Sequence, residues 1–337
     1  MKNISILFLS IFIILTFSFC HNNLSSGKND KDLSPIELLT KQIAEDPKNP
    51  ELYIKRAELY KSKNDLNNAI LDAQKAVQLD NKNYSYYLVL ADLFLAANQI
   101  QGTISTLNAV LSDEPNNVEA NLKMAELNLI FKRYSHVLEN ANTVLNVDPF
   151  NAKAFFIKGY SFMEQGDTTT AVKNYQESIK NDPEFYKAHV QLGILYKIKH
   201  NPIAVTYFQN AINIEPKNID AYYNLGLFYQ ENDKLNLAQE TYRMINEIDP
   251  KYPYSYFNTG FILLEISKTP DEAAKYFALA IKNKPDYYEA HFNLGLCFEE
   301  LGNLEKAKMS YENALKYQNN YQKAIEGLNR IDEIMLR

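Results

Sequence analysis

Apolar residues recur along this chain at the spacing of amphipathic helices, as pairs of stripes separated by short turns. The turn inside a pair is polar or contains glycine, as in Gln165-Gly166-Asp167 and Leu301-Gly302-Asn303. A second turn, marked by Pro or Asn, recurs about every 34 residues at Pro47, Asn81, Pro115, Pro149, Pro183, Pro216, Pro250, Pro285 and Asn319. Such a period predicts a solenoid, in which each repeat buries its apolar face against its neighbours.

Small residues occupy a fixed place in the first helix of every period. They are Ala57, Ala91, Ala125, Gly159, Gly193, Gly226, Gly260 and Gly295. The second helix has its own series, which includes Ala69, Ala171, Ala204, Ala238, Ala273 and Ala307. A glycine inside a helix costs about 1 kcal/mol relative to alanine. Five glycines in register therefore indicate that the two helices approach closely at this place.

The residues of one period form a combined pattern. Residues 219–252 read Tyr222-x2-Leu225-Gly226-x2-Tyr229, then Ala238-x3-Tyr242, then Asp249-Pro250. This resembles the tetratricopeptide repeat, with Tyr or His where that family usually has Trp. The resemblance implies an all-α fold, a right-handed superhelical solenoid of helix-turn-helix repeats with terminal capping helices. Repeat three fits less well, because Asn121 and Asn128 replace its two aromatic residues.

The repeats are expected to cover residues 50–321, numbered here one to eight. Their bounds are 50–83, 84–117, 118–151, 152–185, 186–218, 219–252, 253–287 and 288–321. A capping helix is expected on each side, within residues 33–49 and 322–337.

The first 20 residues have the layout of an export signal, since Lys2 precedes the uncharged run 4–19 and Cys20 follows it. The run is shorter than the roughly 20 residues of a membrane span. It resembles a bacterial lipoprotein signal with Cys20 as the lipidated residue, and polar residues 21–32 then form a flexible tether. This predicts a protein of a Gram-negative cell envelope, lipid-anchored to a membrane. Cleavage after Ser18, giving a soluble secreted or periplasmic form, and an uncleaved anchor are the alternatives.

Composition and motifs argue against enzymatic chemistry. The net charge of −6 disfavours nonspecific binding of nucleic acid. His189 and His291 occupy the fourth place of their repeats, where most others have an aromatic ring, so we expect packing rather than metal binding or catalysis. Cys297 is expected to be a buried thiol. We predict no enzyme activity, no cofactor and no metal.

In the tetratricopeptide family, the second, fifth, sixth, ninth and twelfth residues of the first helices line a concave groove. Carried over to repeats one to three, the ninth places are Glu58, Asp92 and Glu126, an acidic patch that would favour a basic partner segment. Acids at helix starts can instead complement the helix dipole, but this does not explain acids at ninth places.

The last three repeats differ in these places. Their sixth places are Asn224, Asn258 and Asn293, each able to donate and accept hydrogen bonds. Such a ladder resembles that of superhelical tetratricopeptide proteins which hold a peptide by its backbone, although it is also close to the family's average sequence. Aromatic residues accompany it at Tyr223, Phe257, Phe292 and Phe261, and in repeat four at Phe156 and Tyr160.

These features predict a non-enzymatic scaffold or adaptor that binds extended segments of partner proteins in its groove. The alternative is a carbohydrate-binding or polysaccharide-export component that stacks sugar rings on the aromatic residues.

Overall fold

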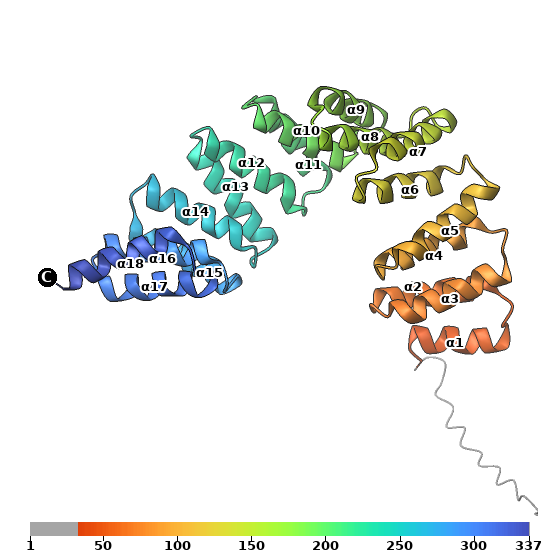
Figure 1. Cartoon of the computed structure of the whole chain (residues 1–337), viewed down its shortest axis with the longest axis horizontal. Helices are drawn as coiled ribbons and strands as arrows, with labels where there is room; N and C mark the ends of the chain where they lie inside the picture. The colour runs from red at the N-terminus through yellow and green to blue at the C-terminus, as the bar shows by residue number, and fades with distance from the viewer. Residues whose placement is uncertain (1–32, 337) are drawn as a thin grey trace, which may run out of the picture. The chain divides into compact units, whose positions relative to one another are not determined.

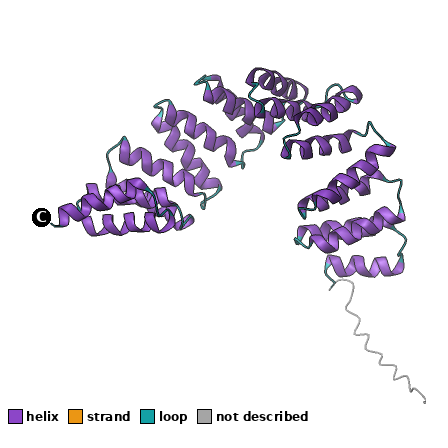
Figure 2. Cartoon of the chain, viewed as in Figure 1, coloured by secondary structure: helices purple, strands orange, loops and turns teal. Residues whose placement is uncertain are grey.

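The computed structural model describes residues 33–336, and its secondary structure in this range is entirely α-helical (Figures 1 and 2). The first six repeats hold the pairs α2 (Pro50–Ser62) and α3 (Leu66–Leu79), α4 (Tyr84–Ala96) and α5 (Ile100–Asp113), α6 (Val118–Ile130) and α7 (Tyr134–Val147), α8 (Ala152–Glu164) and α9 (Thr168–Asn181), α10 (Tyr186–Ile198) and α11 (Ile203–Ile214), and α12 (Ile219–Glu231) and α13 (Leu235–Ile248). Repeats seven and eight hold α14 (Pro253–Glu265) and α15 (Pro270–Asn283), and α16 (Tyr288–Glu300) and α17 (Leu304–Tyr317).

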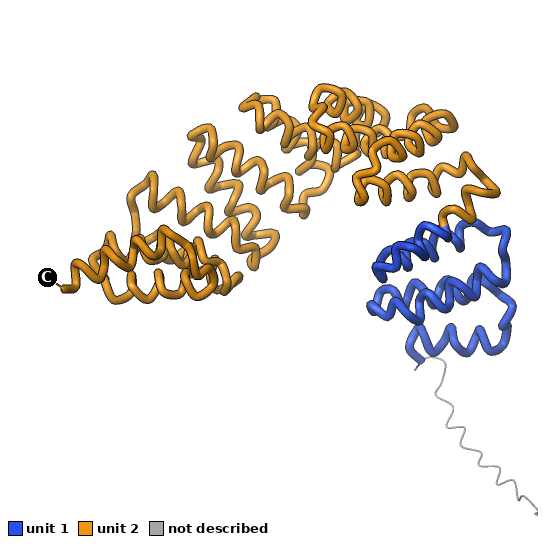
Figure 3. Tube along the Cα trace, viewed as in Figure 1, with its two compact units in different colours: residues 1–106 blue, residues 107–337 orange. Residues whose placement is uncertain are grey.

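Two further helices flank these pairs, α1 (Pro35–Glu45) before them and α18 (Gln322–Met335) after them. The predicted fold class, an all-helical repeat solenoid, is confirmed for the described part of the chain. The described residues form two compact units, 33–106 and 107–336, and the division falls inside α5 (Figure 3). The predicted signal, tether and Cys20 lie outside the described residues.

The turn inside each repeat requires one residue in the left-handed backbone region. These residues are Asn64, Asn98, Lys132, Gly166, His200, Asp233, Lys268 and Gly302, one per repeat. Glycine occupies the position in repeats four and eight, where its φ is +82° and +73°. The other six repeats use residues with a Cβ atom, for which this conformation costs about 1–2 kcal/mol. Asn, Asp and His adopt this conformation more readily than other residues with a Cβ atom, so the helix pair imposes the turn on an unfavourable residue only at Lys132 and Lys268.

The glycines at the eighth place of the first helix face an aromatic ring of the second helix. A Cβ atom added to each would approach that ring to a distance that real Cβ atoms avoid. The distances are 2.7 Å for Gly159 and Tyr175, 2.5 Å for Gly193 and Phe208, 2.5 Å for Gly226 and Tyr242, 3.0 Å for Gly260 and Phe277, and 2.5 Å for Gly295 and Tyr311. Repeat one has Ala57 at the eighth place and Ala73 at the place of the ring. The close packing predicted for the glycines is confirmed.

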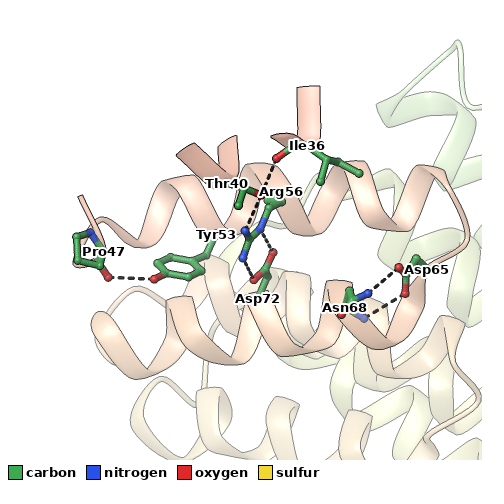
Figure 4. Close-up of polar contacts among 8 residues, drawn as sticks. All are labelled: Ile36, Thr40, Pro47, Tyr53, Arg56, Asp65, Asn68 and Asp72. Carbon is green, nitrogen blue, oxygen red and sulfur yellow. Dashed lines mark hydrogen bonds and ion pairs between the residues drawn. The ribbon is translucent and has the colours of Figure 1, made fainter. Parts of the chain in front are cut away.

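Helix α1 is attached to repeat one through Arg56 (Figure 4). The Arg56 guanidinium donates through Nε and Nη2 to both carboxylate oxygens of Asp72, at 2.7 and 2.8 Å. Its Nη1 donates to Oγ1 of Thr40 on α1, at 2.9 Å. Bidentate bonds between charged groups are among the stronger hydrogen bonds in proteins. Arg56 stands at the seventh place, which is Leu in repeats two, five, six and eight, so this end of the solenoid uses a polar contact where those repeats have an apolar residue.

Helix α18 is attached to repeat eight by a similar pair. Arg330 donates through Nε and Nη2 to the two carboxylate oxygens of Glu299, at 2.9 Å each. Ile331 of α18 is fully buried in the same cluster as Phe292 and Tyr311. An arginine paired with a carboxylate thus lies at each end: Arg330 of α18 bonds directly to repeat eight, whereas Arg56 of repeat one bonds to α1 through Thr40.

The contact between Gly226 and Tyr242 can be tested with a double-mutant cycle. Gly226→Ala should destabilise the chain by about 1–3 kcal/mol, because the added methyl group would lie 2.5 Å from the Tyr242 ring. In a Tyr242→Leu background the same change should cost little or even stabilise, since alanine favours a helix over glycine by about 1 kcal/mol. Denaturant unfolding of the four proteins measures both effects. An equal cost in the two backgrounds would show that the ring does not impose the glycine.

Candidate functional site

The fifth-place aromatic residues lie in the contacts between helices. Each packs against a ring of its own second helix and against a ring at the start of the following helix. The ring-centroid distances are 5.6 and 5.2 Å from Phe156 to Tyr175 and Phe185, 6.5 and 5.6 Å from Tyr223 to Tyr242 and Tyr252, 5.6 and 4.8 Å from Phe257 to Phe277 and Tyr287, and 5.6 and 5.4 Å from Phe292 to Tyr311 and Tyr321. Phe292 is only 9% exposed, and the other three are partly buried.

The second ring of each set stands at the N-cap of the following helix. The residue type at this N-cap depends on the residue type at the fifth place of the preceding repeat. Where the fifth place is Ile54, Leu88, Leu122 or Val190, the next first helix begins at an Asn. The side chains of Asn49, Asn83, Asn117, Asn151 and Asn218 accept a hydrogen bond from the backbone of the helix they precede. Where the fifth place is aromatic, the N-cap is Phe185, Tyr252, Tyr287 or Tyr321, and none of these caps its helix through its side chain.

A ring contact therefore replaces a capping bond in four repeat junctions. An Asn N-cap stabilises a helix by about 1 kcal/mol, and an aromatic pair contributes about 0.5–1.5 kcal/mol beyond its buried area. The exchange is close to balanced in energy, which allows both solutions in one chain. The sequence interpretation missed the four N-cap rings, although the residue two after the turn Pro alternates visibly between Asn and an aromatic type. Packing between helices explains why aromatic residues occupy the fifth places. Contact of these rings with a partner stays a prediction.

The three asparagines of the predicted ladder differ in accessibility. Asn224 is partly exposed, whereas Asn258 and Asn293 are 8% and 7% exposed. The amide nitrogens of Asn224 and Asn293 donate to the carbonyl four residues earlier, of Asp220 at 2.9 Å and Glu289 at 2.8 Å. The amide nitrogen of Asn258 is buried and makes no hydrogen bond of good geometry, although the side chain lies beside the hydroxyls of Tyr223 and Tyr242 and interacts with them. Because an amide has two N–H donors and one acceptor oxygen, a single bond to the helix leaves capacity for another.

The ninth places form a row of partly buried apolar side chains in five consecutive repeats. The row consists of Tyr160, Ile194, Leu227, Phe261 and Leu296. The ninth place follows the fifth by one helical turn, so the two lie on the same face of the helix. Tyr160, Ile194, Phe261 and Leu296 are partly buried against neighbouring core clusters, and each keeps part of its apolar surface accessible on this face.

The ninth places of repeats one to three are acidic, as predicted, but they fall in different compact units. Glu58 and Asp92 lie in the first unit, and Glu58 is exposed. Glu126 lies in the second unit, where it forms an ion pair with Lys153 at 2.9 Å. The positive charge of Lys153 offsets the negative charge of Glu126. The predicted acidic patch is therefore less negative than its residue types suggest.

The fourth place of the first helix supplies a hydrogen-bond donor to the preceding turn. The Nε2 atoms of His189 and His291 lie 2.9 Å from the carbonyl oxygens of Pro183 and Pro285. A carbonyl only accepts, so Nε2 carries the hydrogen. Equivalent bonds join Tyr53 to Pro47 at 3.1 Å, Tyr87 to Asn81 at 3.4 Å, Asn121 to Pro115 at 2.9 Å, Tyr222 to Pro216 at 3.3 Å and Tyr256 to Pro250 at 3.1 Å. The two histidines thus have a structural role, as hydrogen-bond donors to the preceding turn.

Repeat three keeps this bond through its unusual asparagines. Asn121 donates to the Pro115 carbonyl and accepts from the amide of Asn140 at 3.0 Å. Asn128 donates to Asn140 at 3.2 Å. Asn121 and Asn128 are 2% and 7% exposed, and buried amides require such partners. The misfit in the sequence pattern is therefore a polar network that takes the place of two rings.

Chemistry-bearing groups are otherwise scarce within residues 33–336. No group of His, Cys, Asp and Glu side chains in this range could hold a metal ion. Burial raises the pKa of the Cys297 thiol to about 12, so it stays protonated and unreactive at neutral pH. Among the helices α1 to α18, none has both the length and the apolar character to span a membrane.

Tetratricopeptide repeat models match residues 153–184, 207–240 and 263–323, and a model of the ChAPs (Chs5p-Arf1p-binding proteins) matches residues 27–128. The protein O-mannosyl-transferase TMTC3 of Homo sapiens is 25% identical over 158 residues, which are 46% of this chain and 17% of that protein. The chain thus spans a small part of this relative's length, and the match does not bring over its activity.

Two solved structures share the fold. The C-terminal part of a TPR repeat-containing protein from Cytophaga hutchinsonii aligns with a TM-score of 0.58 and 19% identity, covering 72% of this chain and 99% of that one. The Cut9–Hcn1 hetero-tetramer of the APC/C aligns with a TM-score of 0.54 and 15% identity, covering 88% of this chain and 58% of that one. Repeats of this kind are generally protein-interaction scaffolds, and this is the function class that the matches support.

Repeat four offers a gain-of-stability test, because its fourth place is Phe155, which has no donor for the Pro149 carbonyl. Phe155→Tyr should supply the missing hydroxyl and raise the free energy of unfolding by about 0.5–1.5 kcal/mol. Tyr256→Phe, the reverse change in repeat seven, should lower it by a similar amount, since it removes the 3.1 Å bond to Pro250. Denaturant unfolding measures both. Unchanged stability in both variants would show that the bond from the fourth place to the turn carbonyl does not stabilise the fold.

Proposed function

We propose that this protein is a non-enzymatic adaptor that holds an extended segment of a partner protein along the first helices of repeats four to eight. The observation that carries the proposal is the apolar ninth-place row of Tyr160, Ile194, Leu227, Phe261 and Leu296. Contiguous apolar side chains on a surface mark interaction sites more often than scattered ones do. The tetratricopeptide matches cover parts of these same repeats.

The asparagines supply the polar part of the proposed site. An extended segment presents a backbone N–H and C=O at every residue, and each must keep a partner when it leaves water. Asn224 is accessible and has its amide oriented by the bond to Asp220. The amide of Asn258 is a buried donor. A carbonyl of the partner could accept its hydrogen bond after a small movement of the side chains that cover the amide. We place the contact with the partner's backbone at these residues.

A glycan is the less favoured occupant of this face. A sugar ring stacks on an open aromatic face, and the fifth-place rings of Phe156, Phe257 and Phe292 each have two aromatic neighbours within the protein. An extended peptide needs grooves and amides more than open rings. These are the features that the ninth and sixth places offer.

The proposal extends to the compartment. The sequence of residues 1–20 supports a lipoprotein in the envelope of a Gram-negative bacterium, anchored through Cys20 and joined to the repeats by residues 21–32. A soluble secreted or periplasmic form is the alternative. A tethered scaffold would keep its partner within reach of the membrane surface.

The proposed surface is tested by photo-crosslinking and capture of the partner, followed by calorimetric titration with variants. Ile194→Gln, Leu227→Gln and Phe261→Gln together should weaken binding at least tenfold, because they remove apolar area from the contact. The matched control changes three exposed apolar residues of second helices, Leu237, Leu279 and Met309, to Gln. Binding by the control should stay within about threefold of wild type. Equal losses in both variants would place the surface elsewhere.

The asparagines form a second arm of the same titration. Replacing Asn224, Asn258 and Asn293 by Ala should weaken a partner held by its backbone by about 1–3 kcal/mol for each lost pairing. Stability should change little, because Ala favours a helix and the change at Asn258 removes a buried donor that lacks a partner. Affinity within about threefold of wild type, at an unchanged thermal midpoint, would assign these residues to the repeat framework alone.

The lipid anchor is tested by one substitution. Cys20→Ser should release the protein from the membrane fraction or leave an unprocessed precursor, because serine lacks the thiol that accepts the lipid. Fractionation and the mass of the mature chain measure the two outcomes. Unchanged membrane partition together with unchanged processing would exclude lipidation at this residue.

A further inference from the structure

A hollow of about 610 Å³ opens at the junction of repeats seven and eight. Tyrosine rings and carboxylates line it, from the start of α14, the start of α16 and the end of α17: Tyr254, Asp286, Tyr287, Tyr288, Glu289 and Tyr317. It lies apart from the ninth-place row, since none of the row residues lines it. Neither the fold class nor the proposed backbone contact accounts for it.

The hollow already accommodates one cation, the side chain of Lys284. Its Nζ donates to the hydroxyl of Tyr254 at 3.0 Å and lies 5.0 and 4.9 Å from the ring centroids of Tyr254 and Tyr287. A ring face attracts a cation at this distance. The hydrogen bond to Tyr254 raises the pKa of Lys284, with the carboxylates of Asp286 and Glu289 adding to the effect, so the amine stays charged.

The remaining groups favour more positive charge. Two carboxylates, exposed Asp286 and partly exposed Glu289, and one ammonium, that of Lys284, line the hollow; a second ammonium, that of Lys316, lies 5.5 Å from the ring centroid of Tyr317. Tyr317 is 41% exposed and stacks on His291 at 5.5 Å. Tyr288 packs edge-on against Tyr321 at 5.0 Å, and its hydroxyl interacts with Glu289. Rings and carboxylates side by side form the surroundings in which guanidinium and ammonium groups bind.

We infer that this hollow receives a cationic side chain, arginine or lysine, of the partner segment. The inference rests on the proposed function and adds a charge requirement to it. An anion entering the hollow would meet Asp286 and Glu289, whereas Lys284, the one cation among the residues that line it, is already held by Tyr254. The net charge of −6 for the whole chain adds a weaker long-range attraction of the same sign.

The test uses the full-length chain labelled with 3-fluorotyrosine and small probes in place of the partner. The chain has 24 tyrosines, so the two reporting signals must be assigned. The ¹⁹F signal that disappears in Tyr288→Phe or in Tyr317→Phe belongs to the replaced residue. N-acetylarginine methylamide should shift both signals saturably, whereas the citrulline analogue, its neutral isostere, should not. Equal shifts with citrulline, or tighter binding of the N-acetylglutamate analogue, would overturn the inference.

Two charge variants then fix the sign of the interaction. Glu289→Gln should weaken the arginine probe about three- to tenfold, whereas Asp220→Asn, at the same second place of repeat six, should leave it unchanged. Lys284→Gln should tighten the arginine probe severalfold, because it removes a cation that occupies two ring faces. An anion site would respond to Lys284→Gln in the opposite direction. Thermal midpoints within a few degrees of wild type confirm that each variant is folded.

Failure of this test is distinguishable from failure of the proposed function. The probes report on the hollow without any partner, so absence of arginine binding overturns the charge requirement alone. The ninth-place row is tested separately, by the titration of the partner with the row variants. Conversely, a partner that binds independently of the row removes the proposed function. The arginine affinity of the isolated hollow is unaffected by that outcome.

Discussion

The structure of residues 33–336 depends on how closely the two helices of a repeat approach at the eighth place. Glycine there lets an aromatic ring of the second helix lie where a Cβ atom would otherwise be, as Gly226 does for Tyr242. From Tyr242 the ring contacts continue to Tyr223 and Tyr252 of the same repeat, and then to Tyr254 and Tyr287 of repeat seven. The glycine that makes room for Tyr242 thus supports a continuous series of ring contacts across repeats six and seven.

This use of the aromatic residues changes which side chains are available to a partner. Rings that look like a binding row in sequence are held between helices, because each finds a second ring at the following N-cap. The face of the first helices is left with the ninth-place apolar row and with the amides of the sixth place. At one junction the rings reach the surface beside carboxylates, and there the chemistry changes from apolar packing to the attraction of a cation.

Polar residues at the fourth place show how one physical requirement is met by different amino acids. A donor must reach a turn carbonyl six residues earlier, and Tyr, His and Asn all provide it in different repeats. The sequence pattern predicted aromatic packing at these places, which describes only the ring. The hydrogen bond explains why His189, His291 and Asn121 are acceptable substitutes, and why Phe155 is the exception.

The sequence by itself determined the fold class, because the 34-residue period and the paired stripes leave each repeat with an apolar face that only a neighbouring repeat can cover. It also determined that the five glycines mark a close approach, since their cost in a helix must be offset by packing. Only the tertiary structure decided which polar and aromatic residues remain accessible. Asn258 lies beside the Tyr223 hydroxyl and Phe292 packs against the Tyr321 ring, so the burial of both depends on residues outside their own helices. A pattern that counts positions within one helix cannot contain the neighbour that covers them.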